Sequence, residues 1–312
     1  MIIALIVVLL ILILASFMIG DYFCNIALNP KVSKNYILRN VTEEGKKEEY
    51  FNNKNGERWL QEFASRVNII SEDDLKLNGY EVINPMKKSE TWVILVHGYM
   101  GCAYEMVQYA KQFINMGYNV LLIDLRAHGK SEGKYIGMGW KDRLDLKKWI
   151  DKLCFNYPNC NIILYGVSMG AATVMMTSGE KLPNNVKICI EDCGYSSVLR
   201  EFKLILKILK PYIADYIINV SSFVAKIKAG YSYKDASSIK QVIKSDLPTL
   251  FIHGEKDTFV AYEMLDEIYE AANSQKEKLV IKNAGHAECS KINPTLYWNT
   301  IKKFIEQNMV IN

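Results

Sequence analysis

The sequence has few of the side chains that bind metal ions. It contains only four histidines in 312 residues, and it has no C-x-x-C pair and no H-E-x-x-H segment. Structural and catalytic zinc sites use these patterns, so we expect no metal site. The histidines are His97, His128, His253 and His286.

A strong net charge is also missing. The formal charge is +4 at pH 7, and the basic residues are spread along the chain. Because nucleic-acid-binding proteins gather basic residues on one face, the sequence predicts no nucleic-acid partner. The length and the 50% share of hydrophobic residues suffice for one large α/β domain with an appendage.

Disulfide-scaffold spacing is absent as well. The cysteines form an odd set of seven, which fits either a reducing compartment or thiols buried in an apolar core. They are Cys24, Cys102, Cys154, Cys160, Cys189, Cys193 and Cys289.

Charged side chains are absent from the start of the chain. Ile2 to Gly20 include a single polar residue, Ser16, and a helix of this length crosses the hydrocarbon core of a bilayer. A cleaved signal peptide is the alternative, but no Lys or Arg precedes the run and Ala15-Ser16-Phe17 is a poor cleavage site. We therefore expect residues 1–20 to be a retained single-pass membrane anchor.

The segment that follows, residues 21–64, is polar and of mixed charge. We expect a tether that ends in a short helix at residues 59–63. Positive charges flank the apolar run on this side, at Lys31, Lys34 and Arg39. By the positive-inside rule, the folded domain then faces the cytoplasm.

Residues 65–312 have the pattern of an α/β fold. Two alternating runs, at 66–70 and 75–83, predict a β-hairpin with one buried face. Six runs that are apolar on both faces then alternate with helical patterns, as in a doubly wound, mostly parallel sheet of eight strands. The six runs cover residues 92–96, 119–123, 161–165, 186–190, 249–252 and 278–281, and the helical patterns cover 104–116, 141–155, 171–182, 262–272 and 295–307.

This alternation is interrupted at residues 196–240, which carry no strand pattern. Apolar residues recur at helical spacing over 198–209 and again over 213–227, after Pro211. They predict two amphipathic helices that form a cap over the carboxyl edge of the sheet. The polar face of the first helix is basic, which suits either solvent or an anionic membrane surface. Its basic residues are Arg200, Lys203, Lys207 and Lys210.

The segment Gly166-Val-Ser168-Met-Gly170 lies between an expected strand and an expected helix. A serine at the apex of such a turn is the arrangement of a nucleophile elbow, whose glycines leave room for the strained residue. The same pattern also occurs in ordinary turns whose serine has no chemical role. A nucleophilic serine needs a base, and that base needs an orienting acid.

Candidates for both groups follow later strands. His286, in the loop after the last expected strand, is the candidate base, and Asp257, after the strand before it, is the candidate acid. Asp192 is the alternative acid, because it ends an earlier strand. His97 and His253 end their strands in His-Gly pairs, and we expect them to brace loops.

Two backbone N–H groups are expected to stabilise the negative charge of a tetrahedral intermediate. One is the N–H of Met169, directly after the serine. The other is the N–H of Tyr99, in the loop 97–101, whose glycines let the backbone approach the reacting carbon. We expect His128 to brace this loop.

Five segments resemble the α/β-hydrolase superfamily of serine hydrolases, and in particular bacterial membrane-anchored hydrolases described as prolyl-oligopeptidase-like or BEM46-like. Ser168, Asp257 and His286 also follow the chain order of that superfamily's triad. The resemblance covers about residue 66 to the C-terminus and implies hydrolysis of an ester, thioester or amide through an acyl-serine, without a metal or organic cofactor. The segments are 97–101, 124–133, 165–170, 253–257 and 284–286.

The expected anchor and apolar cap favour a small or acyl ester as substrate, cleaved by a serine esterase or lipase-like enzyme. A peptidase is the first alternative, although the sequence has no propeller domain and no evident acidic pair for a substrate amino terminus. A thioesterase such as a protein depalmitoylase is the second. The non-enzymatic alternative is a hydrolase fold that serves as an interaction module, which would predict a broken triad.

Overall fold

The computed structural model describes residues 1–32 and 54–309. At its centre lies a sheet of eight strands in the order β1-β2-β4-β3-β5-β6-β7-β8. β1 and β2 pair antiparallel, β2 also pairs antiparallel with β4, and the strands from β3 to β8 are mutually parallel. The predicted mostly parallel sheet of eight strands is confirmed. The strands are β1 (Ser65–Ile70), β2 (Lys76–Val82), β3 (Thr91–Val96), β4 (Asn119–Ile123), β5 (Asn161–Val167), β6 (Val186–Asp192), β7 (Thr249–Gly254) and β8 (Lys276–Ile281).

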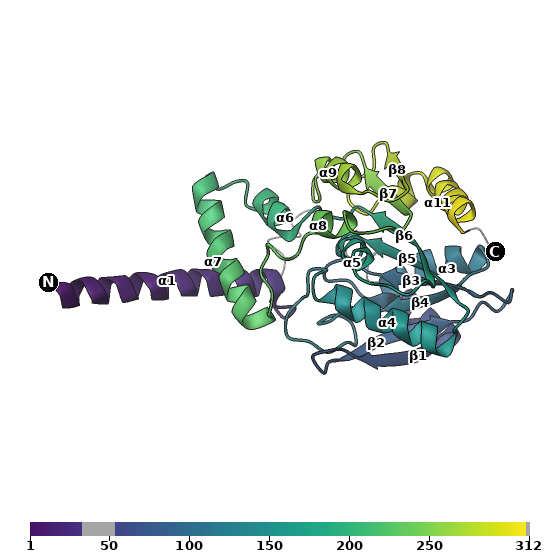
Figure 1. Ribbon diagram of the computed structural model, residues 1–312, viewed down its shortest axis with the longest axis horizontal. Coiled ribbons are helices and arrows are strands. Elements are labelled where there is room, and N and C mark those ends of the chain that lie inside the picture. The colour runs from purple at the N-terminus through teal and green to yellow at the C-terminus, as the bar shows by residue number, and fades with distance from the viewer. Residues whose placement is uncertain (33–53, 310–312) are drawn as a thin grey trace.

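Helices cover both faces of this sheet (Figure 1). In β3, Ile94 and Val96 pack into the core layer that contains α4 and α5, while Val93 and Leu95 pack into the layer that contains α3 and α11. This two-sided burial explains why the strand is apolar throughout. The covering helices are η1 (Ala103–Met106), α3 (Val107–Asn115), α4 (Asp142–Asn156), α5 (Met169–Ser178), α9 (Glu263–Ala271), α10 (Cys289–Ile292) and α11 (Pro294–Asn308).

The cap is inserted between β6 and β7. It contains α6 (Val198–Ile205), α7 (Pro211–Ala229) and the short α8 (Ser238–Val242), and an isolated bridge between Ser197 and Ser237 closes its base. The helix expected over 198–209 ends at Ile205. A turn follows, because the ring of Pro211 lacks the N–H that a continuing helix would need, and Pro211 instead starts α7.

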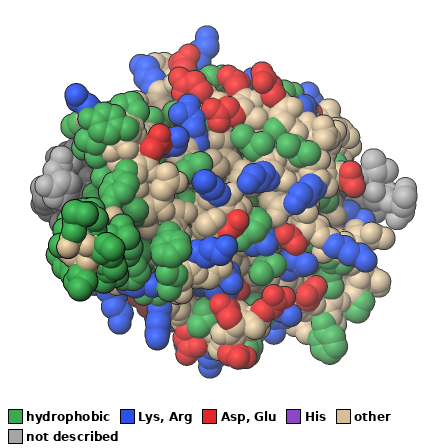
Figure 2. All heavy atoms as spheres, turned by 60° about the vertical axis from the view of Figure 1, so that its left-hand side comes forward, with side chains coloured by type: hydrophobic (Ala, Val, Ile, Leu, Met, Phe, Trp, Pro, Cys, Tyr) green, Lys and Arg blue, Asp and Glu red, His purple; other side chains and the backbone are tan. Residues whose placement is uncertain are grey.

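The N-terminal helix α1 (Ile2–Leu28) is longer than the expected anchor. Its exposed half projects from the body, and hydrophobic side chains gather on that side of the molecule (Figures 1 and 2). Beyond Gly20 the helix continues, because Cys24 and Leu28 are buried in the core and Asp21 pairs with Lys228 of α7. The expected tether therefore starts after Leu28, and its part at residues 33–53 lies outside the described residues. A helix at residues 54–63 includes the one expected at 59–63.

Candidate active site

Ser168 occupies the apex of the turn between β5 and α5. Its backbone has φ 56° and ψ −117°, a combination that L-residues rarely adopt. The neighbouring strand enforces this conformation, because the Ser168 N–H donates to the Asp192 carbonyl oxygen at 2.8 Å. Backbone strain of this kind persists only where the surrounding structure fixes it.

The two glycines of the turn are required by close backbone contacts. A Cβ atom on Gly166 would lie 2.2 Å from the carbonyl oxygen of Gly170, and a Cβ atom on Gly170 would lie 2.0 Å from the carbonyl oxygen of Val96. Both distances are far below van der Waals contact. The first glycine therefore lets α5 begin directly above β5, and the second lets it pack against β3.

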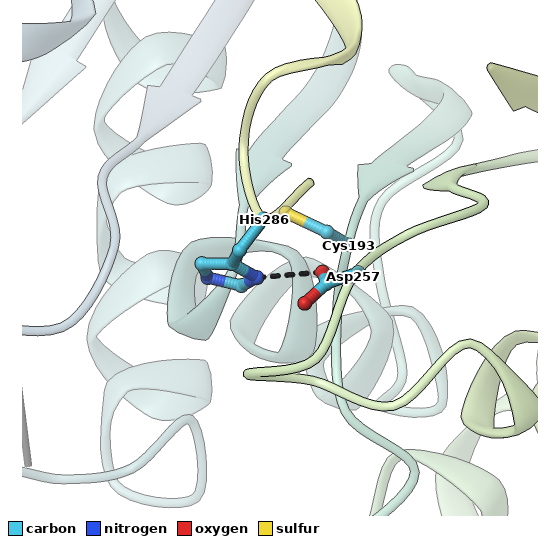
Figure 3. Close-up of side chains that lie close together, drawn as sticks. All are labelled: Cys193, Asp257 and His286. Atoms are coloured by element: carbon cyan, nitrogen blue, oxygen red, sulfur yellow. Dashed lines mark hydrogen bonds and ion pairs between the residues drawn. The ribbon is translucent and has the colours of Figure 1, made fainter. Parts of the chain in front are cut away.

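His286 lies between Ser168 and Asp257. Its Nε2 atom is 2.8 Å from Ser168 Oγ, and its Nδ1 atom is 2.7 Å from Asp257 Oδ2. With the Nδ1 proton donated to Asp257, Nε2 is free to accept the serine proton. The Asp257 side chain is fully buried, whereas that of His286 is 22% exposed. Figure 3 shows the imidazole ring directed at the Asp257 carboxylate.

Asp257 is fixed by several donors besides His286. Its Oδ1 atom accepts the N–H groups of Phe259 and Val260 at 2.9 and 3.0 Å, and His253 Nε2 lies 3.3 Å from Oδ2. Burial acts to raise the pKa of Asp257, but hydrogen bonds with His253 and His286 outweigh it and lower the pKa to about 2. The carboxylate therefore stays ionised at neutral pH. His253 braces this loop, as expected.

The alternative acid, Asp192, is directed elsewhere. Its Oδ2 atom accepts the hydroxyl of Tyr297 at 2.7 Å, and its backbone carbonyl supports Ser168. Burial raises the pKa of Asp192 to about 6, although the Tyr297 hydrogen bond opposes the shift. The carboxylate that the structure pairs with His286 is thus that of Asp257.

The loop 97–101 passes directly beside the serine. A Cβ atom on Gly98 would lie 3.4 Å from Ser168 Cβ and 3.9 Å from Ser168 Oγ. Met169 is the first residue of α5, so its N–H belongs to the helix-terminal groups that lack a partner within the helix. The loop at Gly98 and the N-terminus of α5 at Met169 therefore both lie next to Ser168.

Two buried histidines hold this loop in place. His97 Nε2 accepts the N–H of Leu125 at 3.0 Å, and burial lowers the pKa of His97 to about 4, so the ring stays neutral and can accept. His128 Nε2 accepts the N–H of Met100 at 3.1 Å, which is the bracing contact expected of it. Both rings are therefore structural supports of the loop.

Ser168 borders two hollows. The smaller is mostly apolar, with a volume of about 30 Å³, and lies between α6 and the end of α1. The larger has a volume of about 320 Å³ and includes His286. The small hollow is lined by Ala27, Tyr99, Met169, Tyr195, Glu201, Phe202, Ile205, Phe259 and Val260.

Glu201 of α6 is a residue of this site that sequence reasoning missed. Its side chain is buried beside the small hollow, and neither carboxylate oxygen has a hydrogen-bond partner among the described residues. Burial, with a smaller effect of Asp257, raises the pKa of Glu201 to about 8. Its local pattern did not single it out, because an acidic residue in the first turn of a helix is already explained by the helix dipole.

Cys193 also lies beside the His286–Asp257 pair. The sulfur, a carboxylate oxygen and a ring nitrogen of these three residues are within 4.8 Å of one another (Figure 3). Metal binding requires a thiolate. Burial and the neighbouring Asp192 and Asp257 carboxylates raise the pKa of Cys193 well above its usual value. The other two groups are already hydrogen-bonded to each other, His286 Nδ1 to Asp257 Oδ2.

Known proteins share this fold. The family described as "Serine aminopeptidase, S33" matches residues 87–191. YqkD of Bacillus subtilis is 26% identical over 231 residues, which cover 74% of this chain and 75% of that protein. Protein bem46 of Schizosaccharomyces pombe is 23% identical over 251 residues, with coverage of 78% and 77%.

Solved structures extend the comparison to most of the chain. The Pyrococcus furiosus esterase Pf2001 superimposes with a TM-score of 0.66 at 27% sequence identity, over 81% of this chain and 94% of the esterase. The match reaches well beyond the segment covered by the family.

Proposed function

Because the chain belongs to the α/β-hydrolase superfamily and is BEM46-like, we propose that it is a serine hydrolase that cleaves acyl esters, with Ser168, His286 and Asp257 as its catalytic triad. The observation that carries this proposal is the continuous contact from Ser168 Oγ through His286 to Asp257, at 2.8 and 2.7 Å. Since each group of an acyl-serine mechanism has its partner within hydrogen-bond distance, the site needs no rearrangement before it reacts.

The reaction has two halves. Ser168 Oγ attacks the ester carbonyl carbon while His286 Nε2 takes the hydroxyl proton, and His286 returns that proton to the leaving alcohol as the acyl-serine forms. Water then attacks the acyl-serine, His286 takes and returns a proton in the same way, and the carboxylic acid leaves. The ionised Asp257 stabilises the imidazolium in both halves.

The oxyanion of each tetrahedral intermediate would be bound by the N–H groups of Tyr99 and Met169. Loss of one such donor typically costs about 3–4 kcal/mol of transition-state stabilisation. The position of Gly98 supports this assignment, because a Cβ atom there would be in van der Waals contact with Ser168 and Tyr99 is the next residue.

The apolar lining of the small hollow favours an acyl group as the part of the substrate next to Ser168. Phe202 and Ile205 of α6 and Ala27 of α1 contribute to this lining. Transfer of methylene groups into such a lining is favourable by about 0.8 kcal/mol each. The larger hollow, on the His286 side, would then receive the alcohol.

Hydrolysis of p-nitrophenyl esters of graded chain length, beside aminoacyl-anilides, tests this substrate class. We expect the full-length protein to hydrolyse the esters and Ser168→Ala to hydrolyse none of them. Activity confined to the anilides would refute the proposed class while leaving the triad intact.

A peptidase that acts on an aminoacyl group is the second candidate, and Glu201 is the observation that favours it. An ammonium group in the small hollow would pair with a carboxylate that has no other partner among the residues that the structure describes. Glu201→Gln would then raise KM for the aminoacyl-anilides by at least about tenfold and leave ester hydrolysis unchanged. Equal kinetics of both proteins on the anilides would exclude this role.

We also propose that α1 anchors the protein in a membrane, with the catalytic domain in the cytoplasm. α1 is the one helix among the described residues that is long and apolar enough to cross a membrane, and its most apolar window is not buried. The basic residues that follow it, beginning with Lys31, support the cytoplasmic orientation.

A further inference from the structure

The exposed part of α1 ends where the helix meets the body. The first buried residue of α1 is Gly20, and Cys24 and Leu28 follow on the same side of the helix. At about 1.5 Å per residue, the preceding residues 2–19 measure about 27 Å, close to the thickness of a bilayer's hydrocarbon core. Gly20 therefore marks the level of the membrane surface if α1 spans the bilayer.

The helix that meets α1 at this level is α7. A Cβ atom on Gly20 would lie 2.6 Å from the carbonyl oxygen of Val220, so the two backbones are in direct contact. Ser16 and Tyr216 are hydrogen-bonded at 2.6 Å on one side of this contact, and Asp21 and Lys228 form an ion pair on the other. α7 lies across α1 rather than along it (Figure 1). It therefore lies along the surface of a membrane that α1 crosses.

α7 has two apolar faces, and the structure buries only one of them. The buried face includes Ala214, Ile218 and Ala225, and Val220 and Val224 beside it lie against Gly20 of α1. The opposite face consists of an outer stripe of residues spaced by four, seven and four positions, which keeps them on one side of a helix. The outer stripe is Tyr212, Tyr216, Phe223 and Ile227, with 69%, 44%, 63% and 60% of their surfaces exposed.

Basic side chains lie next to this stripe. The cap helices and the turn between them, residues 198–229, contain six Lys or Arg residues and only two acidic ones, Glu201 and Asp215. Glu201 is buried and Asp215 is paired with Lys203. Exposed Lys207 and Lys210 lie in the turn that leads into α7, beside Ile208, which is 91% exposed. An exposed apolar stripe beside exposed lysines is typical of helices that lie in the headgroup region of anionic bilayers.

We propose that α7 lies in the interface of an anionic bilayer, with its outer stripe in contact with the upper acyl chains, so that the cap is docked on the membrane that α1 crosses. The stripe is continuous with the exposed surface of α1 through the contact of Tyr216 with Ser16. A lipid surface therefore covers both helices at once. This placement is independent of the catalytic roles proposed for Ser168 and its partners.

Docking of the cap places the small hollow on the side of the molecule that faces the bilayer. Its lining includes Phe202 and Ile205 of α6 and Ala27 at the end of α1, and these helices are both in contact with α7. A lipid acyl chain would then approach Ser168 from the side of the cap. This consequence, unlike the docking itself, rests on the proposed esterase function.

Fluorescence quenching by brominated lipids tests the docking. The full-length protein is reconstituted in vesicles of phosphatidylcholine and phosphatidylglycerol, part of which is brominated near the carboxyl end of the acyl chains. Phe223→Trp adds one indole to the outer stripe, and the wild type with its five tryptophans supplies the background. The matched control is Phe155→Trp, because Phe155 is 86% exposed near the end of α4, at the sheet edge opposite the cap.

We expect brominated lipid to remove about half or more of the fluorescence added by Phe223→Trp, and almost none of that added by Phe155→Trp. Iodide, an aqueous quencher, should act in the opposite order. Quenching of the Phe223→Trp signal by iodide alone would show that the stripe faces water and would overturn the proposal. Protection from both quenchers would also overturn it, because a second copy of the chain would then cover the stripe. An exposed aromatic exchange leaves the packing intact, and an unchanged circular dichroism spectrum checks this.

Discussion

Asp257 and Asp192 both lie near His286, but their surroundings shift the pKa values of the two carboxyl groups in opposite directions. The hydrogen bonds with His253 and His286 keep Asp257 ionised, whereas burial raises the pKa of Asp192 and its carboxylate accepts the hydroxyl of Tyr297. Only Asp257 lies against the imidazole. The choice between the two acids, which the sequence left open, is therefore made by geometry.

Single Asn substitutions distinguish these two residues. We expect Asp257→Asn to lower kcat by about 10⁴-fold, because the neutral amide neither holds the required tautomer of His286 nor stabilises its charged form. Asp192→Asn should lower kcat by no more than about tenfold, since it changes only a supporting contact. Ester hydrolysis by the two purified variants measures the difference. A larger loss in Asp192→Asn would contradict the assignment.

Glu201 destabilises the folded protein at high pH, where its buried carboxyl group must ionise. Its pKa is about 8 in the folded protein against an ordinary value of 4.5, so the folded state favours the protonated acid. The contribution of this carboxyl group to the free energy of unfolding is fully present below pH 4.5 and is lost as the pH rises through 8. The reason is that the group loses its proton at a lower pH in the unfolded chain than in the folded protein.

Glu201→Gln removes this dependence. We expect the variant and the wild type to have similar Tm values near pH 4.5 and the variant to unfold at a higher temperature at pH 8, by about 2–4 °C for each kcal/mol regained. Thermal unfolding in detergent at the two pH values measures this. An equal Tm difference between the variant and the wild type at both pH values would show that the Glu201 carboxyl group does not titrate between them.

At the scale of elements, glycines serve two different purposes around Ser168. Gly170 lets α5 approach β3, whereas Gly98 keeps space free next to the serine. The first is a requirement of folding and the second a requirement of the reaction. The corresponding alanine substitutions should therefore affect different quantities.

We expect Gly170→Ala to lower the free energy of unfolding by about 3 kcal/mol or more, because its methyl group would lie 2.0 Å from the Val96 carbonyl oxygen. Gly98→Ala should leave stability nearly unchanged, since its nearest contact of 3.4 Å is ordinary, and should lower kcat about 10–100-fold by crowding the oxyanion position. Thermal unfolding and ester hydrolysis of both variants separate the effects. Full activity of Gly98→Ala would contradict the proposed oxyanion hole.

The elements with the clearest sequence pattern were predicted within one or two residues. The strand expected at 92–96 is Thr91–Val96, and the one expected at 119–123 is Asn119–Ile123, because burial on both faces leaves a continuous apolar run. The end of α1 was not predictable, since Asp21 is accommodated by Lys228, about 200 residues away in the chain. A contact between residues so far apart in the chain produces no periodic pattern in the local sequence.

The same limit applies to the candidate site. The residues of the proposed triad were predicted to lie together because each follows a strand in a recognisable segment, and the parallel sheet brings these strand ends together. Glu201 was not predicted, because its position at the small hollow depends on how the cap folds over the sheet. Local sequence therefore indicated the candidate triad, and tertiary packing determined the shape of the hollows beside it.

At the scale of the whole molecule, the proposed orientation in the membrane rests on the charges beside α1. We expect the full-length protein to resist carbonate extraction and a C-terminal tag to be protected from added protease in sealed right-side-out vesicles, because the basic residues after α1 favour the cytoplasmic side. Digestion of the tag should follow only when the vesicles are opened. Digestion in sealed vesicles would reverse the orientation.

The central claim is that Ser168 is a nucleophile activated by His286. Labelling of the full-length protein with a fluorophosphonate, followed by peptide mass spectrometry, tests it most directly. We predict a single labelled residue, Ser168, with no labelling of Ser168→Ala and a labelling rate lowered by at least about 10³-fold in His286→Ala. A folded wild type that takes no label, or label that persists in Ser168→Ala, would contradict the account.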